Sequence, residues 1–557
     1  MTADSTASLG IALAQLNPTV GDLAGNAALA RKARGEAAAM GADLIVYSEL
    51  FITGYPPEDL IQKPAFVAAA CEAIEALARE TGDGGPAMLI GTPWPGEDKP
   101  YNSVALLDRG AVADVRHKVD LPNYGVFDEK RIFASGAMPG PINFRDIRLG
   151  APICEDIWSE DVCECLAETG AELLLVPNGS PFTVSKHEIR MTHSVGRVTE
   201  TGLPLAYVNQ VGGQDELVFD GCSFVLNPGG GLAVQMPAWR EALRLTNWTR
   251  SAAGWRCEPG ELAVLEEGDG AIYRACVLGL RDYVGKTGFP GVVLGLSGGI
   301  DSALTAALAV DALGADRVHC VMLPYRYTSN ESLSDAAGCA EALGVHYEIV
   351  PIGAPVEALE ASLKPIFKDR PPDVTEENLQ SRTRGTVLMA ISNKFGTMLL
   401  TTGNKSEVSV GYATLYGDMN GGFNPIKDLY KMQVYALARY RNRTRPQDCL
   451  GPEGVVIPEN IIGKAPTAEL KPGQRDQDTL PSYEVLDDIL NCLVELEMPL
   501  NEIVARGHAP ELVKKVERML YLAEYKRRQA APGVKITAKN FGRDRRYPIT
   551  NKFREKL

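Results

Sequence analysis

The sequence predicts an α/β protein with more than one domain. Its 557 residues are enough for two or three domains of ordinary size. In the first half, short apolar runs alternate with alanine-rich stretches of helical length, an alternation typical of an α/β sandwich. In the second half, an apolar run, a glycine-rich loop and a helical stretch follow one another, which is how a doubly wound parallel sheet begins.

Strands are expected where a short apolar run is bounded by glycine, proline or polar residues. In the first half the runs that fit are residues 10–15, 44–48, 88–91, 103–107, 112–117, 148–153, 173–176, 206–209 and 223–226. The helices expected between them include residues 27–40 and 64–80. In the second half we expect a helix at 271–287, a strand at 292–296 and a helix at 302–313.

The domain boundary is expected at residues 251–270. This segment has little apolar pattern and contains the run Glu266-Glu-Gly-Asp-Gly270, which is typical of a linker. We therefore expect one domain at 1–250 and a second at 271–557. Two segments rich in proline and polar residues, 368–378 and 444–478, predict long loops, and loops of that length are usually functional or mobile.

The charge is unevenly distributed along the chain. The formal net charge is −15, which disfavours binding to nucleic acid or to an anionic membrane. Residues 513–557 nevertheless carry 14 Lys and Arg against four acidic residues, and we call this segment the basic tail. The composition alone is compatible with a solvated basic surface or with a segment that contacts phosphates.

The cysteine and histidine content predicts an intracellular protein without a zinc motif. The 11 cysteines form no Cys-x-x-Cys, and the six histidines are not spaced like zinc ligands. Reduced thiols, together with the lack of a secretory signal at residues 1–6 and of a long apolar run, predict a cytoplasmic protein.

Three reactive side chains follow predicted strands of the first half. They are Glu49, Lys118 and Cys154. Because ligands bind beyond the carboxyl ends of strands in α/β sheets, the three could converge there. A thiol nucleophile, a carboxylate base and an ammonium group that stabilises an oxyanion would suit acyl transfer. Each residue alone has an ordinary alternative, because a buried cysteine can simply fill a core and single charges are usually solvated.

The sequences around these residues resemble the nitrilase, or carbon–nitrogen hydrolase, superfamily over residues 8–240. The matching segments are Ser48-Glu-Leu-Phe-Ile-Thr-Gly-Tyr55, Arg116-His-Lys-Val-Asp-Leu-Pro122 and Pro152-Ile-Cys-Glu-Asp-Ile-Trp158. The resemblance implies an α-β-β-α sandwich with Glu49 as general base, Lys118 as oxyanion stabiliser and Cys154 as nucleophile. Among the glutamine amidotransferases of this superfamily, Tyr124, Ser180 and Lys186 match positions that contact glutamine. The segments Phe127-Asp-Glu129 and Gly213-Gln-Asp215 lie in family loops without an assigned role.

A second candidate site is the glycine-rich loop between the predicted strand and helix of the second half. Its residues are Gly295, Leu296, Ser297, Gly298, Gly299, Ile300, Asp301 and Ser302. Glycines and a helix N-terminus suit phosphate binding. Asp301 would repel a phosphate unless a cation intervened, which predicts Mg²⁺. The loop lacks the Gly-Lys-Ser/Thr of a Walker A motif, and a plain turn is the alternative.

This loop resembles the pyrophosphate loop of ATP pyrophosphatases, and the rest of residues 265–557 resembles NAD synthetases among them. The matching segments are Glu377-Asn-Leu-Gln-Ser-Arg-Thr-Arg-Gly385, Thr401-Thr-Gly-Asn-Lys-Ser-Glu407, Glu524-Tyr-Lys-Arg-Arg528 and Lys539-Asn-Phe-Gly-Arg-Asp-Arg-Arg546. The implied contacts are Thr402 and Lys431 with ATP; Asn378, Glu407, Tyr412, Ala413, Thr414, Leu415 and Lys526 with deamido-NAD; and Asp301 and Glu407 with the metal. The basic tail would then offer cations to a diphosphate, while Asp316 and Lys427 are expected to be surface charges.

Together the two halves resemble the family of glutamine-dependent NAD synthetases. The resemblance implies a homo-oligomer that takes glutamine, ATP and deamido-NAD. Because the two sites lie on separate domains and free ammonia is protonated in water, we expect an internal tunnel from Cys154 to the loop at 295–302. Three alternatives are another glutamine-fed adenylating enzyme acting on a different carboxylate or carbonyl, an amidase with a nucleotide-sensing domain, and a non-enzymatic scaffold. The last two would make no pyrophosphate, and competition by deamido-NAD would distinguish the first.

Overall fold

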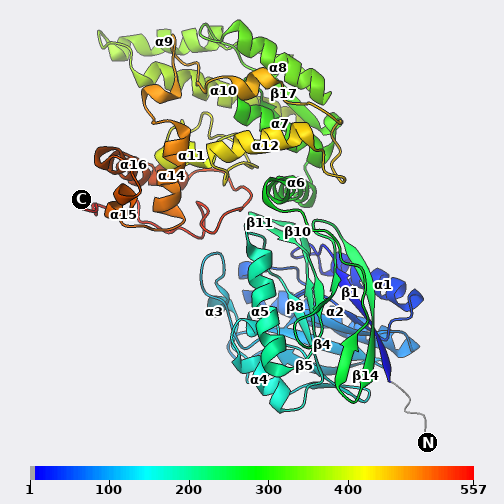
Figure 1. Cartoon of the computed structure of the whole chain (residues 1–557). Coiled ribbons are helices and arrows are strands. Elements are labelled where there is room, and N and C mark those ends of the chain that lie inside the picture. The colour runs from blue at the N-terminus through cyan, green and yellow to red at the C-terminus, as the bar shows by residue number, and fades with distance from the viewer. Residues whose placement is uncertain (1–6, 557) are drawn as a thin grey trace, which may run out of the picture. The chain divides into compact units, whose positions relative to one another are not determined.

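The computed structural model describes residues 7–556, and the chain divides into two units, Met1–Glu266 and Glu267–Leu557 (Figure 1). The boundary falls inside the segment 251–270 expected to be a linker. Part of that segment is regular structure, because β15 (Gly254–Cys257) pairs with the preceding strand and α6 (Gly268–Lys286) already begins there. The residues 1–6 used to judge a secretory signal lie outside the described residues.

The first unit contains two large sheets. One has the order β15-β14-β1-β2-β3-β4-β5 and the other β13-β12-β9-β8-β7-β6. The remaining strands of the first sheet are β1 (Ser8–Gln15), β2 (Leu44–Val46), β3 (Ala87–Trp94), β4 (Tyr101–Asp108), β5 (Ala111–His117) and β14 (Ala242–Ser251). Those of the second are β6 (Ile142–Phe144), β7 (Ile147–Gly150), β8 (Leu173–Asn178), β9 (Leu205–Asn209), β12 (Phe224–Leu226) and β13 (Leu232–Gln235). A separate hairpin joins β10 (Val211–Gln214) to β11 (Leu217–Asp220).

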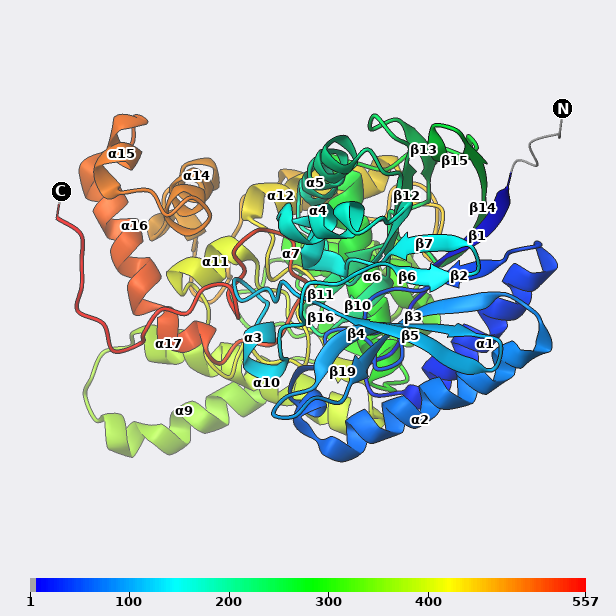
Figure 2. The ribbon, with the colours of Figure 1, turned by 90° about the horizontal axis from the view of Figure 1, so that it is seen from below.

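The two sheets form the middle layers of an α-β-β-α sandwich, as the resemblance implied. Ile11 of the first sheet and Leu175 of the second belong to one apolar cluster between the sheets. The alternate residue Ala12 faces the other way and packs with α1 (Leu23–Ala39) and α2 (Pro64–Glu80). On the opposite side, α4 (Asp161–Glu168) and α5 (Lys186–Thr201) cover the second sheet (Figure 2). A short helix, α3 (Glu129–Ile132), lies in the loop after β5.

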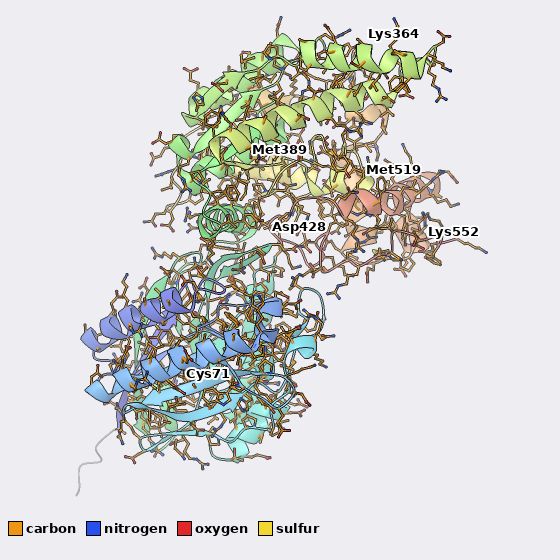
Figure 3. The ribbon with its side chains drawn as sticks, turned by 180° about the vertical axis from the view of Figure 1, so that it is seen from behind. Cys71, Lys364, Met389, Asp428, Met519 and Lys552 are labelled. Carbon is orange, nitrogen blue, oxygen red and sulfur yellow. The ribbon has the colours of Figure 1, made fainter. Side chains whose placement is uncertain are left out.

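The second unit contains the predicted doubly wound sheet. Four parallel strands have the order β18-β17-β16-β19, formed by β16 (Val292–Gly295), β17 (Val318–Met322), β18 (His346–Ile349) and β19 (Met398–Leu399). The helices of the sheet region are α7 (Ile300–Leu313), α8 (Asn330–Leu343), α9 (Gly353–Phe367) and α10 (Val374–Phe395). Helices α9 and α10 lie side by side, with Lys364 towards the end of α9 (Figures 1 and 3).

The rest of the second unit is helical. Its helices are α11 (Lys405–Val410), α12 (Lys431–Arg443), α13 (Glu459–Gly463), α14 (Tyr483–Val494), α15 (Leu500–Ala505), α16 (Pro510–Leu522) and α17 (Glu524–Arg527). Helices α14, α15 and α16 share an apolar cluster with α11. The predicted loops at 368–378 and 444–478 are interrupted by the start of α10 and by α13. None of the helices in residues 7–556 combines the length and apolar character that crossing a bilayer requires.

Candidate active sites

The first unit brings Glu49 and Lys118 into direct contact. Glu49 follows β2 and Lys118 follows β5, so both residues lie just beyond the carboxyl end of a strand. The Nζ of Lys118 lies 2.7 Å from Oε1 of Glu49, and neither side chain is exposed. The thiol of Cys154, which follows β7, is buried and experiences the charges of both residues. The three predicted residues therefore form one buried group.

A second carboxylate, that of Glu129 in α3, completes this group. Lys118 Nζ lies 3.0 Å from both carboxylate oxygens of Glu129. The hydroxyl of Tyr55 donates to Glu129 at 2.7 Å, and the amide of Asn102 donates to Glu49 at 2.7 Å. Sequence reasoning assigned Glu129 no role. Glu129 stands in the charged run Asp128-Glu-Lys-Arg131, so its residue type gave no signal that it is buried beside Lys118.

The electrostatics of this group favour a neutral thiol and a charged lysine. Burial, together with the negative charge of Glu49, raises the pKa of the Cys154 thiol well above its ordinary value. Burial opposes the charge on Lys118, but Glu129 and Glu49 outweigh it and raise the pKa of the ammonium group. Because only the thiolate is a good nucleophile, the thiol needs a base within the site. Among the neighbouring charges, that of Glu49 has the largest effect on this thiol, which agrees with the expectation that Glu49 is the base.

Asp156 ties the loops that carry Cys154 and Lys118. Cys154 has a φ of +47° and stands at the sharp turn between β7 and the next short helix. One carboxylate oxygen of Asp156 accepts from the backbone N–H of Ile153 at 2.9 Å. The other accepts from the backbone N–H groups of Val119 and Asp120 at 3.0 and 2.8 Å. The buried aspartate thus fixes the residue before the cysteine against the residues after the lysine.

Two of the predicted glutamine contacts gather on the segment that follows Cys154. The hydroxyl of Tyr124 donates to Glu155 at 2.8 Å, and both residues line a pocket with Trp158. The Nζ of Lys186 lies 4.1 Å from the centre of the Trp158 ring. This arrangement offers a phenol, a carboxylate and an ammonium group beside the thiol.

The third predicted contact, Ser180, is buried, and its hydroxyl and backbone N–H are hydrogen-bonded to other residues of the protein. Its hydroxyl accepts from Nε of Arg190 at 3.0 Å, and its backbone N–H donates to Asn209 at 3.0 Å. The preceding residue, Gly179, donates its backbone N–H to Glu49 at 2.8 Å. The segment of Ser180 is therefore attached to the catalytic candidates, and its backbone faces Glu49.

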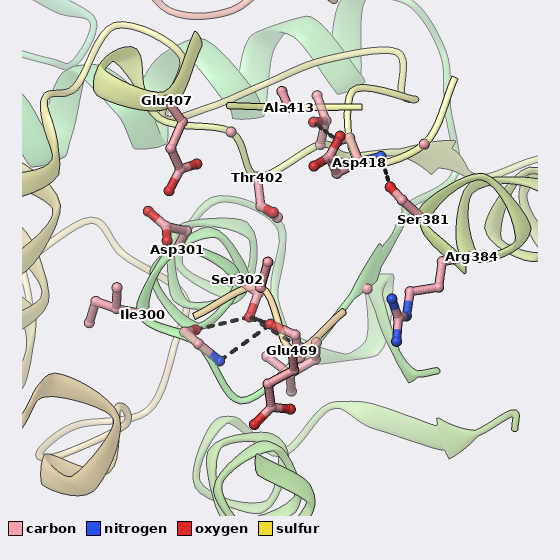
Figure 4. Close-up of a pocket in the computed structure, with 18 of the residues that line it drawn as sticks. Ile300, Asp301, Ser302, Ser381, Arg384, Thr402, Glu407, Ala413, Asp418 and Glu469 are labelled. Carbon is pink, nitrogen blue, oxygen red and sulfur yellow. Dashed lines mark hydrogen bonds between the residues drawn. The ribbon is translucent and has the colours of Figure 1, made fainter. Parts of the chain in front are cut away.

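In the second unit, the glycine-rich loop joins β16 to the N-terminus of α7. The hydroxyl of Ser302 donates to the carbonyl of Gly299 at 3.0 Å and accepts from the backbone N–H of Ser297 at 3.2 Å (Figure 4). Gly298 has a φ of +79°, and a Cβ there would lie 2.4 Å from the carbonyl oxygen of Ser332. The loop therefore needs glycine at position 298. It lines a cavity of the second unit, into which the amino end of the 14-residue helix α7 points.

Two carboxylates face each other beside this loop. Asp301 and Glu407 point towards the same space near Thr402 (Figure 4). The Nζ of Lys431 lies 2.5 Å from Asp301 and 3.1 Å from Glu407, and the amide of Asn404 donates to Asp301 at 2.8 Å. Burial raises the pKa of Glu407 to about 7, with Asp301 adding to the effect and Lys431 opposing it. Paired carboxylate oxygens beside a phosphate loop are a donor set that suits Mg²⁺.

The residues expected to contact deamido-NAD lie around one loop. Lys526 Nζ donates to the carbonyls of Gly411 and Ala413 at 2.7 and 2.6 Å. The hydroxyl of Thr414 donates to Asn378 at 3.0 Å, and that of Tyr412 donates to Asp476 at 3.2 Å. The backbone carbonyl of Leu415, which follows Thr414, accepts from Nε of Arg382 at 3.1 Å. The structure therefore brings these positions together, with Lys526 bound to the loop backbone.

Three further polar residues line the same cavity. Arg384 lies in a segment that was matched from the sequence but given no role, and Asp418 and Glu469 were not singled out. Arg384 is half-buried; its partial removal from water lowers its pKa to about 10, and its Nε donates to the carbonyl of Leu323. The backbone N–H of Thr414 donates to Asp418 at 2.6 Å. Glu469 accepts from the hydroxyl of Ser329, which caps α8, and from that of Ser332 in the first turn of the same helix, both at 2.8 Å. Each belongs to a different loop or helix, so that no local motif joins them.

Part of the basic tail is packed into the second unit, whereas other basic residues of the tail, such as Lys515 and Arg528, are exposed. Arg527 and Arg545 both contact Glu524, at 2.7 and 2.8 Å, and Lys535 lies 2.5 Å from Asp544. All of these side chains are nearly buried, because the tail packs as part of the second unit and its few acids are used inside it. The expectation that Lys427 is a surface charge was wrong, since this residue is buried.

Each unit of the chain matches a known protein family. A family model described as carbon–nitrogen hydrolase matches residues 10–254, and one described as NAD synthase matches residues 272–530. A glutamine-dependent NAD(+) synthetase of Rhodobacter capsulatus is 52% identical over 98% of this chain and 99% of its own length. The corresponding protein of Acinetobacter baylyi is 44% identical and covers 98% of both chains.

A solved structure shares the same architecture. The glutamine-dependent NAD+ synthetase of Acinetobacter baumannii, determined in complex with ADP, is 43% identical and covers 98% of this chain and 99% of that one, with a TM-score of 0.78. With relatives of this similarity over nearly its whole length, the chain belongs to the family of glutamine-dependent NAD(+) synthetases.

Proposed function

We propose that this chain makes NAD+ from deamido-NAD, using ammonia released from glutamine and an adenylation driven by ATP. The observation that carries the proposal is that one chain holds two distinct polar sites. One is the buried group of Glu49, Lys118, Glu129 and Cys154, and the other is the phosphate loop with Asp301, Glu407 and Lys431. The names of the near full-length relatives support the same activity.

In the first unit, Glu49 takes the proton of the Cys154 thiol as the sulfur attacks the carboxamide carbon of glutamine. The oxyanion that forms is stabilised by the ammonium group of Lys118. Collapse of the tetrahedral intermediate, with a proton returned to nitrogen, releases ammonia and leaves a thioester. Water, deprotonated by Glu49, then attacks the thioester and releases glutamate. Tyr124, Ser180 and Lys186 would bind the substrate during these steps.

In the second unit, residues 295–302 would bind the phosphates of ATP through backbone N–H groups and the hydroxyls of Ser297 and Ser302. Thr402 and Lys431 would contact the same nucleotide. A carboxylate oxygen of deamido-NAD attacks the α-phosphorus, and pyrophosphate leaves. Ammonia then attacks the acyl adenylate and AMP leaves, which gives the amide of NAD+.

Asp301 and Glu407 are the residues that would hold Mg²⁺ in this site. When bound, the ion would neutralise negative charge on the phosphates. Asn378 and Lys526 shape the loop at residues 411–415, which would bind deamido-NAD. We also propose that the chain acts as a homo-oligomer.

The test follows NAD+, AMP and glutamate together in the presence of ATP, Mg²⁺, deamido-NAD and glutamine. We expect the three products in equal amounts. Cys154→Ala should abolish glutamine-driven synthesis and leave ammonia-driven synthesis intact, whereas Cys165→Ala, at a half-buried thiol on α4, should change neither. Glutamate without NAD+ or AMP would contradict the proposal. Isotopically labelled ammonia, added beside unlabelled glutamine, tests the expected internal transfer, because free exchange would put the label into NAD+.

A further inference from the structure

Two histidines and a glutamate gather on one face of the parallel sheet of the second unit. His319 of β17 is the direct Cα partner of His346 on the neighbouring strand β18. Glu348 lies two residues after His346, and alternate residues of a strand point to the same face. The three side chains therefore meet because of strand register, and their separation along the chain hides this from a search for metal-ligand spacing.

The donor atoms of these side chains are close enough to share one ion. Nε2 of His319 lies 3.1 Å from one carboxylate oxygen of Glu348, and Nε2 of His346 lies 3.5 Å from the other. One donor atom from each of the three residues can be chosen so that all lie within 4.8 Å of one another. Tetrahedral zinc with bonds of about 2.0–2.1 Å separates its ligand atoms by roughly 3.3 Å. The two distances, which reach different oxygens of Glu348, are both close to that separation.

We propose that His319, His346 and Glu348 form a binding site for a divalent transition-metal ion, with zinc as the best match. Two imidazole nitrogens and one carboxylate are a donor set typical of zinc, whereas Mg²⁺ prefers oxygen ligands throughout. With three protein ligands, the ion keeps a coordination position for water. His346 and Glu348 are more than half exposed, which leaves that position accessible to solvent.

This site is separate from the one proposed for ATP. His319 and His346 stand at the amino ends of their strands, and the phosphate loop follows the carboxyl end of the parallel strand β16. The ring of Phe395, at the end of α10, packs edge-on against His319 with ring centres 6.4 Å apart. β18 is the outermost strand of its sheet, so an ion held here would join that edge strand to its neighbour.

The alternative is that two imidazoles share the carboxylate through hydrogen bonds alone. Equilibrium dialysis of the metal-free, full-length protein against Zn²⁺ distinguishes the two. His346→Gln and Glu348→Gln are suitable variants, because both side chains are largely exposed and the fold should tolerate them. His508→Gln is the matched control, since His508 also contacts a carboxylate, Asp488 at 2.6 Å, and belongs to no such cluster among the described residues.

We expect the two cluster variants to bind Zn²⁺ at this site about tenfold or more weakly, and the control to bind it as the unaltered protein does. Zn²⁺ should also raise the midpoint of thermal unfolding in the unaltered protein and in the control only. All eleven cysteines are free thiols and could bind zinc elsewhere, so Co²⁺ is added in a parallel experiment. Co²⁺ bound to cysteines gives a thiolate charge-transfer band, whereas Co²⁺ bound at this site should not. The absorption component that lacks this band should therefore disappear in the two cluster variants. Equal zinc affinity and stoichiometry in His346→Gln and in the unaltered protein would overturn the proposal.

Discussion

The ammonium group of Lys118 lies between the carboxylates of Glu49 and Glu129, 2.7 Å from the first and 3.0 Å from the second. In the proposed reaction Glu49 accepts the proton of Cys154, and a lysine paired with Glu49 alone would compete with that proton for the carboxylate. The second carboxylate balances this contact, because it supplies Lys118 with a partner that the proton transfer does not use. Glu129 is in turn held by the hydroxyl of Tyr55.

Replacing Glu129 should therefore impair the glutaminase reaction selectively. We expect Glu129→Ala to lower kcat for glutamine hydrolysis by roughly 100-fold, because Lys118 loses the partner that positions it. Glu129→Gln should retain more activity, since an amide oxygen can still accept from Lys118. Ammonia-driven NAD+ synthesis should not change in either variant. Glu164→Gln, at an exposed position of α4, serves as control. A loss of both activities in a folded Glu129→Gln variant would contradict this role.

Asp156 should contribute to stability as well as to the geometry of the first site. Its carboxylate accepts from three backbone N–H groups, two of them beside Lys118 and one beside Cys154. Asp156→Ala leaves these buried donors without an acceptor and should lower the free energy of unfolding of the first unit by about 3 kcal/mol. Asp156→Asn should cost less, because it keeps one acceptor. Thermal unfolding of the two variants measures the difference, and equal midpoints would refute the bridging role.

The same residue predicts a pH dependence of stability. Burial is the largest influence on Asp156 and raises its pKa to about 7, against the effect of its hydrogen bonds. A carboxyl whose pKa is raised on folding stabilises the folded protein at low pH, and this contribution is lost as the pH rises from about 4 to about 7. Unfolding midpoints measured over that range should therefore decline more steeply in the unaltered protein than in Asp156→Asn. Parallel curves would show that Asp156 does not titrate there.

Local sequence patterns predicted the elements that are formed by local signals. The run 173–176 lies within β8, and the helix expected at 64–80 has those bounds in the structure. Strand β14 was not predicted, because its residues are partly polar and it is ordered by antiparallel pairing with β1, more than 200 residues away. The hairpin of β10 and β11 was not predicted for a different reason, because Gly212 and Gly213 weaken the strand pattern.

The candidate sites divide in the same way. Glu49, Lys118, Cys154 and the phosphate loop follow predicted strands, so the sheet topology brings them to an edge where ligands bind. Glu129 was passed over because nothing in its own segment shows that it reaches Lys118. The partners of Lys526 are backbone carbonyls more than 100 residues earlier in the chain, and such contacts leave no pattern in the residue types.

Binding of a divalent cation to the second site should depend on pH. Burial raises the pKa of Glu407 to about 7, so this carboxyl is increasingly protonated below that pH. A protonated carboxyl is a poor metal ligand, and affinity for Mn²⁺, used as a probe for Mg²⁺, should fall as the pH is lowered from 8 to about 6. Glu407→Gln should bind weakly at every pH in that range. Calorimetric titration measures both, and an affinity that does not change with pH in the unaltered protein would exclude Glu407 as a ligand that titrates.

A substitution in the phosphate loop should remove NAD+ synthesis and leave glutamine hydrolysis, the opposite of what is expected for Cys154→Ala. Gly298 has a φ of +79°, which disfavours any residue with a side chain, and its Cβ would collide with the carbonyl of Ser332. Gly298→Ala should therefore displace the loop and lower the rate of NAD+ synthesis at least about tenfold with either glutamine or ammonia, because a strain of about 1–2 kcal/mol adds to the collision. Glutamine hydrolysis should persist. Gly338→Ala is the matched control, since this glycine lies within α8, has no positive φ, and its Cβ would only touch Pro458 at 3.8 Å. Unchanged synthesis in Gly298→Ala would show that the loop does not have to keep this conformation for ATP to react.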